Sequence, residues 1–180
     1  MSLSTLLHDG HGVAGGFTSG ILHPLTGPDH LAAMVAVGLW GAFLGAPAIW
    51  LLPVVFPLVM ALGAVLGLVG MEVPGVEVGI AISAVALGAM VATAAKPPLS
   101  FAALLVGLFA IFHGHAHGTE LPDSANALSY SLGFVLSTGA LHLAGVGLGF
   151  AVEKPGGRKF VRVCGAVIAI AGLGFLFGWF

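Results

Sequence analysis

The chain carries two short segments whose side chains could bind a metal ion. The first, residues 23–30, reads HPLTGPDH and contains His23, Asp29 and His30. Two imidazoles and a carboxylate suit a divalent first-row ion such as nickel, cobalt, copper, iron or zinc, because they bind it while keeping the net charge of the site low. This segment predicts one half of a metal site.

The second segment, residues 112–120, reads FHGHAHGTE. If it is helical, His113, His117 and Glu120 share one face, because they stand at positions i, i+4 and i+7. His115 is turned by about 200° from His113 and faces elsewhere. The shared face predicts a second group of metal ligands.

The composition around these segments is that of an integral membrane protein. Hydrophobic residues make up 58% of the 180 residues and glycine adds 29 more. Charged residues make up only 7%, against about 25% in a soluble domain. So few charges exclude a soluble globular domain, a nucleic-acid binder and a disordered tail. The single cysteine, Cys164, excludes a disulfide framework and a CxxC site.

Polar and Pro/Gly breaks divide the chain into seven apolar segments. They predict an all-α polytopic transmembrane bundle of six full spans plus a short N-terminal helix, in a single transmembrane domain over residues 1–180. The longer segments approach the roughly 20 residues that cross a bilayer as helix, whereas the first is too short to cross alone. It is expected to be a half-helix or the front of a bent span. The segments cover residues 12–22, 29–44, 49–69, 76–95, 99–117, 125–152 and 160–180.

The prolines and the glycine of the first segment predict a break between two helices. Pro24, Gly27 and Pro28 are expected to interrupt the helix and to free backbone carbonyls. Asp29 then begins the next helix, where its carboxylate meets the positive end of the helix dipole. Irregular backbone at membrane depth is tolerated only inside protein or around a cavity, so the break also indicates a site.

The positive charges indicate one orientation. No Lys or Arg precedes Lys96, and the other four lie in the last loop: Lys154, Arg158, Lys159 and Arg162. Two spans separate these loops, so both lie on one side, which the positive-inside rule assigns to the cytoplasm. Both histidine segments and Phe180 then lie outside, where the two segments could meet in one site. The N-terminus lacks the positive region of a secretory signal, so either the first spans direct insertion or a leader is absent.

Four pairs of glycines spaced by three residues predict close helix packing. They are Gly16 and Gly20, Gly63 and Gly67, Gly145 and Gly149, and Gly174 and Gly178.

Both histidine segments resemble motifs of one family. Residues 23–42, HPLTGPDHLAAMVAVGLWGA, resemble the H-x5-DH signature of the HupE/UreJ family of nickel permeases and metallocentre accessory proteins. Residues 112–122, FHGHAHGTELP, resemble its second motif. The resemblance implies a permease of the bacterial cytoplasmic (inner) membrane, not an enzyme, that imports Ni²⁺, or Co²⁺, for hydrogenase or urease maturation.

The resemblance carries metal handling over to His23, Asp29, His30, His113, His117 and Glu120. Additional candidate metal contacts are His115, His142, His8 and His11. For His142 a packing role is an equal alternative, and for His8 and His11 a polar terminus is the simpler interpretation. Acidic residues near the outer rim, Glu72, Glu77 and Asp123, are expected to attract the ion.

The expected partners are a divalent metal ion, membrane lipid, hydrogenase or urease maturation proteins and a second copy of the chain, with no nucleic acid. No prosthetic group is expected; the bound or transported ion is Ni²⁺, with Co²⁺ and Zn²⁺ as alternatives. Two other classes stay open. One is a seven-helix membrane hydrolase with a catalytic zinc, in which His142 and Ser137 would take part. The other is a metal sensor or chaperone that binds ions without moving them.

Overall fold

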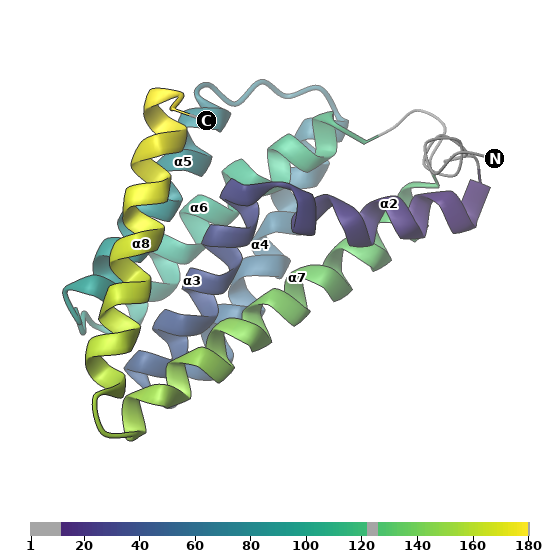
Figure 1. Ribbon diagram of the computed structural model, residues 1–180. Helices are drawn as coiled ribbons and strands as arrows, with labels where there is room; N and C mark the ends of the chain where they lie inside the picture. Colours follow the sequence, from purple (N-terminus) through teal and green to yellow (C-terminus); the bar gives the residue numbers. More distant parts are fainter. Residues whose placement is uncertain (1–11, 122–125, 180) are drawn as a thin grey trace.

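The computed structural model describes residues 12–121 and 126–179, and Figure 1 shows their arrangement. Within these ranges the chain forms seven α-helices, one short 3₁₀ helix and no strand, which confirms the all-α class. The elements are α2 (Gly12–Thr26), α3 (Pro28–Leu44), α4 (Ala48–Leu68), α5 (Val76–Ala92), α6 (Leu99–Thr119), α7 (Ala127–Gly149), η1 (Phe150–Glu153) and α8 (Gly157–Phe177).

Four of the described helices are long and apolar enough to cross a membrane: α4, α6, α7 with η1, and α8. α3 and α5 have 17 residues each, about 26 Å at 1.5 Å per residue, slightly less than a hydrocarbon core of about 30 Å. Exposed side chains such as Leu62, Leu104, Leu136 and Val167 are large and apolar, as a lipid-facing surface requires. The chain is therefore a helical membrane protein, and the structure leaves six full spans as a prediction.

Helices α2 and α3 pack one after the other along α7, and both run parallel to it. Gly20 of α2 lies against the backbone of Tyr130, and Gly38 of α3 lies against the backbone of His142. Only Gly27 separates the two helices, and Figure 1 shows α2, in purple, meeting α3 at a sharp bend. Of the two expectations for the N-terminal segment, the front of a bent span agrees with this course.

The expectation that Pro24 breaks the helix is wrong. Pro24 lies inside α2, which continues to Thr26. The Gly27 amide donates a hydrogen bond to the carbonyl of His23 at 3.2 Å and closes the last turn. Pro24 removes only the hydrogen bond that its own missing N–H would give to Gly20. The helix therefore tolerates the proline, and the break falls at Gly27.

Glycine contacts hold α4 against α6. A Cβ added to Gly114 would collide with the carbonyl of Met60, and one added to Gly118 with that of Ala64. From the other side, a Cβ on Gly63 would collide with the carbonyl of Ile111. Backbones can approach this closely only where side chains are missing, so these glycines set the distance between the two helices.

Three of the four predicted glycine pairs pack in this way, against α7, α6 and α3 respectively. For the fourth pair, the prediction that Gly178 packs against another helix is wrong. Gly178 ends α8 with φ +65° and has no heavy atom within 4 Å of its Cβ position. Its role is to terminate the helix in the left-handed conformation, which glycine adopts without a steric cost.

We expect Gly114→Ala to destabilise the protein by about 1–3 kcal/mol, the usual cost of overpacking, because the new methyl group forces α4 and α6 apart. Thermal unfolding of the purified protein in detergent measures this as a lower Tm. Gly139→Ala on α7 is the matched control, since nothing lies within 4 Å of its Cβ position. Equal Tm values for the two variants would show that the glycine contact does not set the helix distance.

Candidate metal centre

Three histidines from three helices meet at the end of the bundle where α2 joins α3 and α6 ends. His23 lies in the last turn of α2, His30 in the first turn of α3 and His117 in the last turn of α6. One ring nitrogen of each lies within 4.8 Å of the other two. Two nitrogens bound to one ion lie at most about 4.2 Å apart, twice a metal–nitrogen distance of about 2.1 Å. A shift of less than about 1 Å would close this group around an ion.

Asp29 fixes the proton on the ring of His30. The Asp29 Oδ1 atom accepts hydrogen bonds from the His30 amide at 2.8 Å and from Nδ1 of the same ring at 3.1 Å. Because an ionised carboxylate can only accept, Nδ1 carries the proton, and in the neutral form of the ring Nε2 has the free lone pair. The Nε2 atom is buried and has no hydrogen-bond partner in the described ranges. A carboxylate that orients a histidine in this way is typical of metal sites.

The ring of His113, like that of His30, has an acceptor beside its Nδ1 atom. Its Nδ1 lies 3.0 Å from the carbonyl of Phe109, which can only accept, so Nε2 is again the free nitrogen. The ring is fully buried and its centroid lies 4.9 Å from that of His30. His113 therefore extends the three-ring group one helical turn deeper into the bundle.

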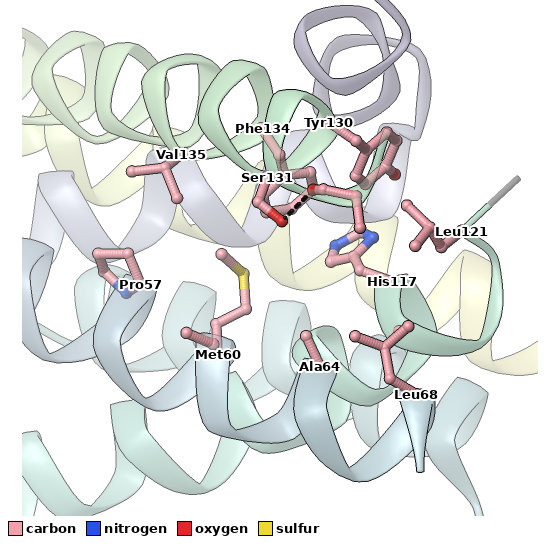
Figure 2. Close-up of a pocket in the computed structure, with 13 residues that line it drawn as sticks. Pro57, Met60, Ala64, Leu68, His117, Leu121, Tyr130, Ser131, Phe134 and Val135 are labelled. Carbon is pink, nitrogen blue, oxygen red and sulfur yellow. Dashed lines mark hydrogen bonds between the residues drawn. The ribbon is translucent and has the colours of Figure 1, made fainter. Parts of the chain in front are cut away.

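His117 lies beside the ring of His30 and is otherwise buried among aromatic and apolar side chains. It is 4% exposed, and neither of its nitrogens has a hydrogen-bond partner among the described residues. Its ring packs on Phe134, with centroids 4.1 Å apart, and borders an apolar cavity of about 90 Å³ that Tyr130 and Met60 also line (Figure 2). A buried polar atom without a partner costs about 1–3 kcal/mol. A metal ion held by these rings would remove that cost.

The carboxylates lie nearer the surface than the rings. Glu120 Oε2 is 3.5 Å from Nε2 of His23, and the Glu120 side chain is about half exposed. Asp29 and Glu77 together line an open groove of about 570 Å³ between α3, α5 and α8. One carboxylate therefore lies beside His23 and another beside His30.

The six residues assigned by resemblance thus lie close together, though their role as ligands stays a prediction. The sequence interpretation did not identify the aromatic wall of Tyr130, Phe134 and Phe56. Tyr130 and Phe134 stand at i and i+4 on α7, a spacing that places both on one helix face and could have marked them.

The additional candidates lie apart from the three-ring group or outside the described residues. His115 points away, as its helical position predicts, and its Nε2 lies 2.8 Å from the carbonyl of Met71 in the α4–α5 loop. His142 lies deeper, on α7, against Phe56. His8 and His11 fall in the range that the structure does not describe. A metal role for these four residues stays a prediction.

The hydrolase alternative gave Ser137 and His142 a part at a catalytic zinc. The Ser137 hydroxyl and both nitrogens of His142 have no hydrogen-bond partner in the described chain, so no hydrogen bond joins the two residues. A catalytic role for them stays a prediction.

Buried histidines flanked by carboxylates, inside an all-helical bundle with an apolar surface, define a membrane protein with a candidate transition-metal site. Residues 1–175 match the family described as HupE / UreJ protein. The chain is also 43% identical over 179 residues to Protein HupE of Rhizobium leguminosarum bv. viciae, covering 99% of this chain and 94% of that protein. The chain therefore belongs to the HupE/UreJ family, which confirms the resemblance. No solved structure shows a significant match.

We expect Ni²⁺ to raise the Tm of the purified protein, because a ligand at 100 times its Kd adds about 2.7 kcal/mol to the free energy of unfolding. His117→Ala removes one of the three rings and should abolish most of this rise. His115→Ala is the control: it should lower the Tm without metal, since it loses its bond to Met71, yet keep the rise with Ni²⁺. An undiminished rise in His117→Ala would contradict the three-ring site.

Proposed function

We propose that this protein is a permease that imports a divalent transition-metal ion, most consistently Ni²⁺ with Co²⁺ as the alternative, for hydrogenase or urease maturation. Membership of the HupE/UreJ family supports the class of function. The observation that carries the proposal is the group of His23, His30 and His117, whose ligand nitrogens lie within 4.8 Å of one another at the outer end of the bundle.

The ion approaches along the acidic surfaces. Glu77 and Asp29 line the open groove on one side, and Glu120 stands beside His23 on the other. Carboxylates attract a hydrated cation from water without needing to strip it first. Glu72 is exposed near the same end and adds to this attraction, whereas Asp123 lies outside the described residues.

Binding then exchanges water for imidazole nitrogen. The Nε2 atoms of His30 and His113 already carry lone pairs, because their Nδ1 atoms are committed to Asp29 and to the Phe109 carbonyl. The site needs no change of tautomer at these rings before an ion binds. Release requires that the ion be held by changing subsets of ligands rather than by all of them at once, with His142 or Met34 as later contacts.

The sequence contains no ATP-binding motif, so the driving force is a gradient or a metal sink in the cytoplasm. Proton exchange is the natural coupling, because protonation of histidine competes with metal binding near neutral pH. A sensor or chaperone would bind the same ion without moving it, so flux across a membrane distinguishes the two classes.

The proposed topology has six crossings in the cytoplasmic membrane of a bacterium. α2 and α3 together form one bent crossing beside α7, and α4 to α8 form the other five. This arrangement has Lys96, Lys154 and the basic first turns of α8 in the cytoplasm, in accordance with the positive-inside rule.

Uptake of radioactive Ni²⁺ into proteoliposomes tests transport. The double variant His23→Ala/Asp29→Ala should lose uptake almost completely, because it removes one ring and the group that orients another. Glu153→Gln, an exposed acid at the opposite end, should retain it. Competition with Co²⁺ and Zn²⁺ ranks the ions. Wild-type uptake in the double variant would refute the permease mechanism, and binding without wild-type flux would favour a sensor or chaperone.

Single-cysteine labelling tests the topology. In a Cys164→Ser background, a membrane-impermeant maleimide should label Glu72→Cys in intact spheroplasts. Lys96→Cys and Lys154→Cys should react only after permeabilisation. Opposite accessibility of Lys96→Cys and Lys154→Cys would exclude the six-crossing arrangement.

A further inference from the structure

The interior of the bundle holds a second set of buried polar groups that the outer site does not use. His142 is 1% exposed, and neither of its ring nitrogens forms a hydrogen bond within the described residues. Thr138 stands one turn earlier on the same face of α7, is fully buried, and has an equally unpartnered hydroxyl. Both groups therefore face the same part of the interior.

The unpartnered hydroxyl of Thr138 contrasts with the hydroxyls of three threonines at helix ends. Thr26, Thr93 and Thr119 each donate to a carbonyl of their own helix, three or four residues earlier. Thr138 has no such bond although its burial makes an unpaired hydroxyl costly. A ligand that binds this hydroxyl would offset the cost.

Helix α4 contributes a backbone oxygen at the same place. Because Pro57 has no N–H, the carbonyl of Pro53 lacks its usual helical partner. This carbonyl approaches the ring of His142 without meeting hydrogen-bond geometry. The ring of Phe56, between these two prolines in the sequence, contacts both His142 and His113, with centroids 5.5 and 5.4 Å apart. Two unpartnered side chains of α7 thus lie on one helix face, and the α4 carbonyl of Pro53 lies beside one of them, His142.

The register of the helices places this position inward of the outer site. His117 packs on Phe134, and His142 follows Phe134 by eight residues, about 12 Å along α7. His113 precedes His117 by four residues, so it lies about 6 Å inward along α6. His113 is therefore at an intermediate depth between the outer rings and His142.

We propose that His142, Thr138 and the carbonyl of Pro53 form an inner binding station for the divalent metal ion, which reaches it from the outer site by way of His113 and past Phe56. The inference rests on the proposed function, because the ion must first bind at the outer rings. One imidazole and two neutral oxygens bind a first-row ion less tightly than three imidazoles with adjacent carboxylates. The station thus accepts an ion that the outer site has dehydrated and holds it weakly enough for release.

The test compares Ni²⁺ binding and Ni²⁺ uptake in the full-length protein. His142→Ala, and His142→Phe, which keeps a ring of similar size, should lower the initial uptake rate into proteoliposomes by about tenfold or more, since even indirect partners of a metal ligand cost about 10- to 100-fold. Equilibrium binding of Ni²⁺ to the outer site in nanodiscs should stay within about twofold of wild type, because the station lies about 12 Å away. Thr138→Val should slow uptake in the same direction and Thr138→Ser should restore it.

Ser137→Ala is the matched control, because it also removes a buried, unpartnered hydroxyl of α7 but one on a different helix face. It should transport at the wild-type rate. Tm and gel-filtration profiles identify variants that fail to fold. If both His142 variants fail to fold, the isosteric Thr138→Val variant tests the station instead. Wild-type uptake in folded His142→Ala or His142→Phe overturns the station, as does an equal loss of binding and uptake. If His30→Ala kept both Ni²⁺ binding and Ni²⁺ uptake, the proposed outer site itself would be wrong.

Discussion

The close contact between the backbones of α4 and α6 is the constraint on which the site depends. Gly114 and Gly118 of α6 face carbonyl oxygens of α4 with no room for a side chain. Because these glycines occupy the α4-facing side, the alternating histidines must point elsewhere. His113 and His117 point toward His30 of α3. The direction of these two rings follows from the position of Gly114 and Gly118 on the face of α6 that packs against α4.

A second consequence is that neighbouring acceptors hold the Nδ1 protons of two rings, His30 and His113. The packing that excludes water also leaves few acceptors, and those present are a carboxylate and a backbone carbonyl. Asp29 and the carbonyl of Phe109 each take the Nδ1 proton of one ring, which leaves Nε2 available on His30 and on His113. Ligands whose protons and orientations are already set lose less free energy when they bind, so neighbouring residues contribute to affinity without touching the ion.

Periodicity and resemblance predicted the helical class, the family and the helix face shared by His113 and His117. They could not predict that α2 continues through Pro24, because contacts with α7 compensate for the lost hydrogen bond. Nor could they predict that α2 and α3 follow α7 in one direction, since long-range packing decides this. The surroundings of His142 were equally inaccessible, because they depend on a carbonyl of α4 and on a ring from the same distant helix.

The candidate ligands change with depth, from carboxylates near the surface to neutral groups inside the bundle. This order follows from the free-energy cost of burying a charge. A carboxylate is far more expensive to remove from water than a neutral imidazole, and the two acids closest to the rings, Glu120 and Asp29, accordingly stay partly exposed. The rings of His117 and His113 are more deeply buried, and the neighbours that the structure gives His142, the ring of Phe56 and the backbone of Gly38, carry no charge. The cost of burying charge therefore orders the candidate ligands from carboxylates near the surface to neutral groups inside the bundle. This is the order of decreasing affinity that the proposed transport requires.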